Sequence, residues 1–224
     1  MFNTKRDNVI PQGCRDKTNY KSPEIIEALN KMFHGKCYIC ETKNLQSPRV
    51  EHRVPHRGDD NIKYDWNNLF LSCERCNSIK SDDFESTIDC CSDDFIISDN
   101  IFIKLEYCPH WKIIASEKQQ NPSEELLETI RLINMCCNQD NTPTRKLSKQ
   151  TLENDINENY SLFMYHKMKI IRGNDHPDEI NRSKKFIINM RNPSYPFSAV
   201  WDGMIQCDNI LSNKLDEINE NSDN

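Results

Sequence analysis

The chain has 224 residues, a net charge of -6 and 29% charged residues. This length is enough for one large domain or two small ones with a real core. No apolar run is long enough to span a membrane, and the polar N-terminal segment lacks the apolar stretch of a signal peptide, so we expect a cytoplasmic protein with no membrane partner. The net negative charge argues against a chain that binds nucleic acid without a partner, because phosphate binding depends on Lys and Arg.

The first predicted element is a helix that starts at Pro23. Ser22 is suited to cap it, and proline is favoured at the first helical position. Apolar residues follow at helical spacing, and Gly35 is expected to end the helix.

A strand–loop–strand–helix unit is predicted next. Residues 50–56 and 69–72 are expected to form two short strands. A helix is expected to start at about Asn77.

Later segments favour further strands and then helices. Residues 95–98 and 101–107 are predicted as strands with a turn at 99–100, and residues 111–115 as a third. From Pro122 on, apolar residues recur at helical spacing. We therefore predict an α+β fold with an N-terminal arm and helix (1–35), a core with a short β extension (36–118) and a mainly α-helical C-terminal region (119–224).

Two C-x-x-C pairs dominate the middle of the chain. Cys37, Cys40, Cys73 and Cys76 can supply four thiolates to one tetrahedral Zn²⁺. Such a site has no open position, so the zinc is expected to be structural. The other seven cysteines stand at irregular positions, which favours free thiols in a reducing compartment over a disulfide scaffold.

A second group of residues lies between and after these two C-x-x-C pairs, the zinc knuckles. His52 is a candidate general base, and Glu51 before it is a candidate ligand for a divalent cation such as Mg²⁺ or Mn²⁺. Asn68 can orient the ring of His52, and Asn77 can reach the cation. Lys80, one helical turn later, can meet a phosphate.

Two structural questions accompany this group. Neighbouring residues of a strand point to opposite faces, so Glu51 and His52 serve one site only if the backbone bends or one acts through the main chain. Basic residues around the motif, Arg53 and Arg57 among them, are candidates for contacts with nucleic-acid phosphates or ordinary solvated charges.

These motifs together resemble the zinc-knuckle HNH endonucleases of the ββα-metal class. The resemblance covers about residues 36–81. It implies His52 as general base, Asn68 as its orienting residue, and Glu51 with Asn77 as metal ligands. The last position departs from the commonest pattern, in which a His stands where this chain has Asn77.

The flanking residues are similar to the nuclease subunit of Septu-type antiphage systems and to related retron-associated HNH effectors. The resemblance implies an ATPase subunit of the ABC or OLD-like type as partner. In retron versions, a reverse transcriptase with its RNA–DNA product is a further partner. The helical region has no phosphate-binding G-x-x-x-x-G-K motif, and we expect it to dock the ATPase and to contribute no catalytic groups.

Two rival functions stay open at this point. The knuckles alone can form a non-catalytic zinc-ribbon adaptor, and the motif also suits a stand-alone restriction or homing nuclease. A second metal site around Cys108 and His110 is disfavoured because the sequence has no further C-x-x-C pair to accompany them. Trp66 is expected to pack rather than to stack on a base.

Overall fold

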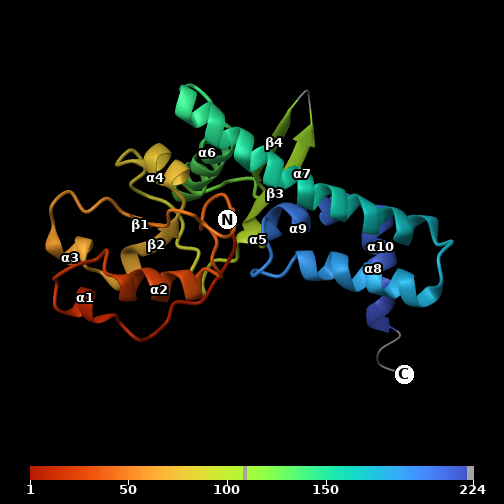
Figure 1. Ribbon diagram of the computed structural model, residues 1–224, viewed down its shortest axis with the longest axis horizontal. Coiled ribbons are helices and arrows are strands. Elements are labelled where there is room, and N and C mark those ends of the chain that lie inside the picture. Colours follow the sequence, from red (N-terminus) through yellow and green to blue (C-terminus); the bar gives the residue numbers. More distant parts are fainter. Residues whose placement is uncertain (108–109, 221–224) are drawn as a thin grey trace.

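The computed structural model describes residues 1–107 and 110–220 (Figure 1). The first half contains α1 Gln12–Arg15, α2 Pro23–Met32, β1 Arg49–His52, α3 Asp60–Lys63, the 3₁₀ turn η1 Trp66–Asn68, β2 Leu69–Ser72, α4 Glu74–Lys80 and α5 Ile97–Asn100. The second half contains β3 Ile101–Tyr107, β4 Trp111–Glu117, α6 Glu124–Asn138, α7 Pro143–Arg172, α8 Pro177–Met190, α9 Ser198–Gln206 and α10 Asn209–Glu220. This mixture of helices with small sheets confirms the predicted α+β class.

The centre of the N-terminal half is a ββα unit. Strands β1 and β2 pair antiparallel, with Glu51 opposite Phe70 and His52 opposite Leu69. Helix α2 packs against β2, and α4 packs against β1. The predicted order of strand, loop, strand and helix is confirmed, although α4 begins inside the second knuckle at Glu74 and not at Asn77.

Helix α2 begins at Pro23, as predicted. The expected cap is different, because the side chain of Ser22 makes no capping hydrogen bond and its buried hydroxyl has no partner among the described residues. The helix also ends before Gly35, which lies in the left-handed region with φ +70° and donates its N–H to Asn30 O.

The prediction of a strand at residues 95–98 is wrong, because the chain enters the short helix α5 there. Asn3 explains the difference. Its side chain donates to Phe95 O (2.7 Å) and accepts from Ile97 N (2.7 Å), so the N-terminal arm satisfies backbone groups that a strand would pair.

The strands predicted at 101–107 and 111–115 are present as β3 and β4, which form a second antiparallel pair. Asn134 and Asn138 of α6 cover the free edge of β4. Each side chain bonds the backbone N–H and C=O of one β4 residue, Ala115 for Asn134 and Ile113 for Asn138. The helix therefore replaces the missing neighbour strand and protects the edge.

The C-terminal helices pack beside this second sheet (Figure 1). Helix α9 packs on β3 at Gly203, where an added Cβ would lie 1.8 Å from Ile103 O. Helices α7 and α8 pack along each other, with Phe163 and Ile187 in the core. The predicted helical region after residue 120 is confirmed, and helices α9 and α10 are additional to the predicted stripes. None of the helices in the described ranges is long and apolar enough to cross a membrane.

Two buried polar clusters join the ββα unit to these helices. Arg75 of α4 donates to Cys136 O (2.8 Å) at the end of α6 and to Arg145 O (2.6 Å) and Ser148 Oγ (2.9 Å) at the start of α7. Lys36 and Glu41 form a fully buried ion pair (2.9 Å) that both residues extend to Ser198 of α9. The contacts therefore cross the predicted division at residue 118.

Candidate functional site

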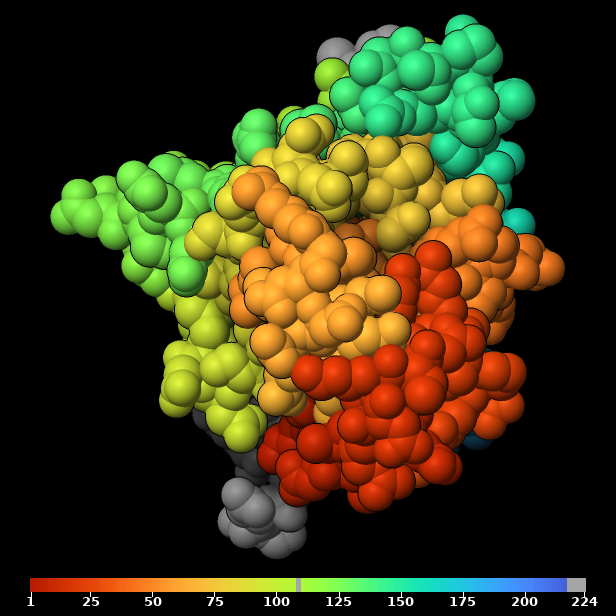
Figure 2. All heavy atoms as spheres, turned by 90° about the vertical axis from the view of Figure 1, so that its left-hand side faces the viewer, coloured from red at the N-terminus to blue at the C-terminus, as the bar shows by residue number. Residues whose placement is uncertain are grey.

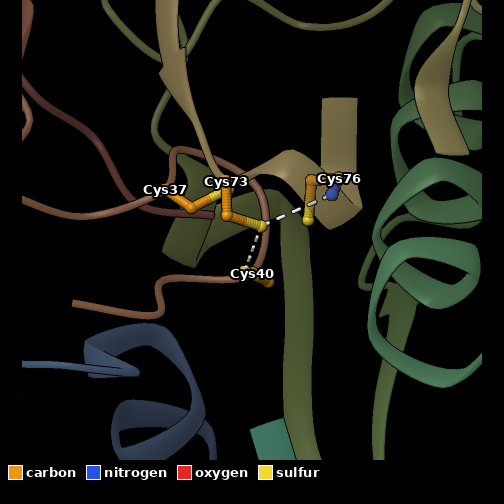
Figure 3. Close-up of side chains that lie close together, drawn as sticks. All are labelled: Cys37, Cys40, Cys73 and Cys76. Carbon is orange, nitrogen blue, oxygen red and sulfur yellow. Dashed lines mark hydrogen bonds between the residues drawn. The ribbon is translucent and has the colours of Figure 1, made fainter. Parts of the chain in front are cut away.

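Four cysteine sulfur atoms converge between the loop after α2 and the start of α4 (Figure 3). All four lie within 4.8 Å of one another, and the sulfurs of Cys40 and Cys73 are 3.8 Å apart. A tetrahedral zinc with bonds of about 2.3 Å places its sulfur ligands about 3.8 Å apart. The cluster therefore has the size of a Zn–Cys₄ site.

The electrostatics of the cluster also fit a cation. Hydrogen bonds from Cys37, Cys73 and Cys76 hold the pKa of Cys40 well below its usual range, whereas the hydrogen bond with Cys37 raises the pKa of Cys73. Without a metal, buried thiols share protons in this way, because four thiolates in a low-dielectric interior repel one another. A Zn²⁺ ion would offset that repulsion, and its closed shell leaves no place for a substrate.

Glu51, Asn77 and Lys80 form a compact polar group beside the ββα unit. The side-chain amide of Asn77 donates to one carboxylate oxygen of Glu51, and the ammonium of Lys80 lies 3.2 Å from the other. Burial raises the pKa of Glu51, while Lys80 and Asn77 lower it. A carboxylate and a side-chain amide are oxygen donors of the type that Mg²⁺ and Mn²⁺ prefer.

The structure corrects the prediction that Lys80 meets a nucleic-acid phosphate. Its side chain is 0% exposed, and besides Glu51 it bonds the backbone carbonyl of His52 at 2.8 Å. A buried ammonium must keep such partners, because leaving one charge of a buried pair alone is costly. Lys80 therefore fixes the positions of Glu51 and of the His52 backbone from inside the protein.

His52 stands at the end of β1 with one ring nitrogen engaged. Its Nε2 lies 2.9 Å from Lys63 O. A carbonyl only accepts, so Nε2 carries the proton and Nδ1 is the acceptor of the ring, which no hydrogen bond engages within the described residues. Burial lowers the pKa of His52. The hydrogen bond with the Lys63 carbonyl raises it by a smaller amount, so the net pKa is lowered. The ring is therefore held neutral, with an acceptor available.

Asn68 acts on the backbone after His52 and not on its ring. Its side chain accepts from Val54 N (2.8 Å) and donates to Val54 O (2.8 Å) and to Ile62 O (3.2 Å). The ring contact that we expected from Asn68 is made by the Lys63 carbonyl. Asn68 thus fixes the bend that follows β1.

Glu51, His52 and Asn77 line one cleft of about 400 Å³. Strand β1 ends at His52, and Glu51 and His52 both line this cleft. Both are still paired within the strand, Glu51 opposite Phe70 and His52 opposite Leu69.

The N-terminal arm and the segment after β1 supply walls that the motif did not predict. Tyr20 sets its ring edge against His52 with the centroids 4.8 Å apart, and the ring of His56 lies 4.7 Å from His52. In the space-filling view, the N-terminal residues lie against the segment that follows β1 (Figure 2). The H-x-x-x-H spacing of His52 and His56 was the one sequence signal for this second ring, whereas nothing in the motif pointed to Tyr20.

The two predicted phosphate contacts of the loop lie outside the cleft lining. Arg53 is half-buried and donates to Thr87 O, and Arg57 is exposed and pairs with Glu85. Lys21 and Arg49 are the basic residues that line the cleft. A role of Arg57 in phosphate binding stays a prediction.

The remaining expectations concern Trp66 and the Cys108–His110 segment. Trp66 is 3% exposed, donates to Asp7 O and carries the guanidinium of Arg6 over its ring. It is a packing residue, as predicted. Cys108 lies outside the described residues.

Comparison with known proteins places most of the cleft lining within a recognised domain. Residues 37–83 match the HNH endonuclease family. The chain therefore contains an HNH endonuclease domain of the zinc-knuckle type, which confirms the resemblance seen in the motifs.

Two curated relatives share part of this region. Septu protein PtuB of Bacillus mycoides (strain KBAB4) is 37% identical over 73 residues, which cover 26% of this chain and 25% of that protein. Septu protein PtuB of Bacillus thuringiensis is 38% identical over 61 residues, with 26% and 24% covered. The chain thus spans about a quarter of the length of the relatives it matches. No solved structure matches the fold.

The Cys₄ site generates a test. Cys76→Ser is expected to lose the metal and to unfold at a much lower temperature, because the free energy of zinc binding contributes directly to folding. Metal analysis and thermal denaturation measure both effects, with Cys207→Ser, an exposed thiol outside the cluster, as control. One zinc per chain retained in Cys76→Ser would contradict the assignment.

Proposed function

We propose that this protein hydrolyses phosphodiester bonds of nucleic acids in the cleft beside β1. The observation that carries the proposal is the convergence of His52, Glu51 and Asn77 on one cleft. Each contributes a different requirement of hydrolysis, namely a proton acceptor, an anionic oxygen ligand and a neutral amide ligand.

His52 serves as the general base. Its Nδ1 accepts the proton of the attacking water, and the Lys63 carbonyl stabilises the imidazolium through the Nε2–H bond. Asn68 keeps the bend after His52 in place, so the ring does not need to reorganise during the reaction.

Glu51 and Asn77 would hold the catalytic divalent cation, Mg²⁺ or Mn²⁺. Rotation of the Asn77 side-chain amide would turn its oxygen, in place of its nitrogen, toward the Glu51 carboxylate. Both residues could then offer oxygen atoms to the cation. When bound, such a cation stabilises the leaving oxygen as a Lewis acid. The buried ammonium of Lys80 pairs with the Glu51 carboxylate, which favours its ionised form and fixes its orientation.

The substrate is a nucleic-acid strand bound through its phosphates. Lys21 and Arg49 stand at the cleft as partners for a polyanion, with Arg57 exposed nearby in the chain. A site of this kind approaches the backbone and carries no base code. The proposal therefore covers DNA and RNA.

We further propose that the protein is the nuclease of an antiphage defence complex. The likeness to Septu protein PtuB in the core region supports this role. The partner would be an ATPase subunit of the ABC or OLD-like type. In a retron version of the system, a reverse transcriptase with its RNA–DNA product would join them.

Helix α7 offers a surface for such a partner. Leu162 and Tyr165, one turn apart on this helix, are 46% and 56% exposed. Exposed aromatic and aliphatic residues of this type are favoured in the cores of interfaces. We therefore place the ATPase contact on this part of α7.

A double substitution tests the contact. Leu162→Asp with Tyr165→Asp is expected to weaken binding of the co-expressed ATPase subunit at least about tenfold, since burying charge at an interface core is unfavourable. Quantitative pull-down measures the effect. The control is Ile210→Asp, which alters an exposed apolar residue of α10, and equal binding by the double variant would refute this placement.

His52→Ala tests the catalytic proposal. Cleavage of nucleic acid by the full chain, with its partner where one is required, should fall about 100- to 10,000-fold, while zinc content and thermal unfolding stay unchanged. His176→Ala, at an exposed histidine far along the chain, is the control.

The same variant separates the nuclease from the zinc-ribbon adaptor. A catalytic role requires that His52→Ala also abolish protection against phage. Full protection by His52→Ala would favour the adaptor and contradict the nuclease.

A further inference from the structure

A second histidine stands in the cleft beside the proposed base. His56 is half-buried and lines the same 400 Å³ cleft as Glu51, His52 and Asn77. Its ring lies 4.7 Å from the ring of His52, at an angle of 62°. The two imidazoles are therefore near enough to act on one bound phosphodiester.

The local backbone fixes the tautomer of His56. Gly58 N donates to Nδ1 of His56 at 3.0 Å. Because that nitrogen accepts, the ring proton of the neutral imidazole is on Nε2. Within the described part of the chain, no other hydrogen bond engages His56 Nε2–H.

The turn that presents the Gly58 N–H adopts an unusual conformation. Arg57 has φ +46° and Gly58 has φ +91°, both in the left-handed region. Asp59 N closes the turn on His56 O at 2.7 Å. An arginine in this region is uncommon, and such conformations persist at functional sites where surrounding contacts hold them.

The two histidines line the same cleft and keep opposite hydrogen-bonding functions. In His52 the Lys63 carbonyl engages Nε2 and leaves an acceptor, whereas in His56 the Gly58 N–H engages Nδ1 and leaves a donor. Hydrolysis needs both, since the water must lose a proton while the phosphate oxygens gain negative charge.

We propose that His56, through Nε2–H, donates a hydrogen bond to a non-bridging oxygen of the scissile phosphodiester. This inference rests on the proposed nuclease function and adds a substrate contact to it. The Nε2–H donor stabilises charge on the oxygen and keeps its proton. No bond forms or breaks at His56.

The alternative is that His56 only packs against the rings of His52 and Tyr20. Two substitutions separate the roles. His56→Phe keeps an aromatic ring and removes the donor, and His56→Gln removes the ring and keeps an N–H donor. A packing role predicts that His56→Phe is the milder change, whereas the donor role predicts the reverse.

The decisive probe is an oligonucleotide with one phosphorothioate of defined stereochemistry at a mapped cleavage position. Sulfur accepts hydrogen bonds poorly, so the wild-type full chain should cleave one diastereomer more slowly, without rescue by the thiophilic cations Mn²⁺ or Cd²⁺. His56→Phe should slow the all-oxygen substrate by about 100-fold and lose this discrimination. His56→Gln should keep most of both.

Several outcomes would overturn the inference. Cleavage by His56→Phe at the wild-type rate is one, and discrimination that persists in His56→Phe is another. Zinc content and thermal unfolding of both variants serve as controls for folding. A wild-type chain that cleaves nothing, with its partner present where one is required, would refute the nuclease proposal instead.

In that event, binding of the unmodified oligonucleotide by fluorescence anisotropy, in buffer without added Mg²⁺ or Mn²⁺, still tests His56. The contact predicts weaker binding by His56→Phe and unchanged binding by His176→Ala, an exposed histidine outside the cleft. Equal affinity of wild type and His56→Phe would then exclude the contact.

Discussion

The four-sulfur cluster is the constraint on which the rest of the site depends. Cys37 and Cys40 belong to the loop after α2, and Cys73 and Cys76 belong to the junction of β2 and α4. Cys73 also caps α4 by accepting the N–H of Cys76. A metal ion at this cluster therefore fixes where β2 ends and in which direction α4 leaves.

The candidate groups that belong to the motif are positioned relative to that junction. Strand β2 pairs with β1, whose end carries Glu51 and His52, and α4 carries Asn77 and Lys80 on adjacent turns. Lys80 then bonds both Glu51 and the backbone of His52. A closed metal site thus provides rigidity, while the groups suited to chemistry lie on the elements it holds.

The same junction is continuous with the helical region. Arg75, between the two cysteines of the second knuckle, holds the carbonyl of Cys136 in α6 and that of Arg145 in α7. The buried pair of Lys36 and Glu41 reaches Ser198 of α9. These contacts give the helices, proposed to bind a partner, a direct mechanical connection to the knuckles.

The sequence predicted the parts of this structure that depend on local spacing. The C-x-x-C pairs, the order of β1, β2 and α4, and the approach of Asn77 to Glu51 follow from the motif. Contacts between distant segments were beyond its reach. Residues 95–98 have the composition of a strand, but Asn3 takes their backbone hydrogen bonds.

At the site itself, burial and long-range contacts also set side-chain positions that the sequence pattern did not predict. Lys80 follows Asn77 by one helical turn, which predicted a contact with phosphate. Its side chain instead points inward and pairs with the buried carboxylate of Glu51. Tyr20 and His56 reach the cleft from the N-terminal arm and from a left-handed turn. The periodicity of apolar residues predicts neither position, because both depend on tertiary contacts between segments.

The central claim is that a closed Zn–Cys₄ site orders the cleft, and zinc K-edge X-ray absorption of the purified full chain tests it most directly. The account predicts one zinc per chain with four sulfur neighbours at about 2.3 Å and no nitrogen or oxygen neighbour. A mixed shell with nitrogen or oxygen ligands, or a folded chain without zinc, would contradict it.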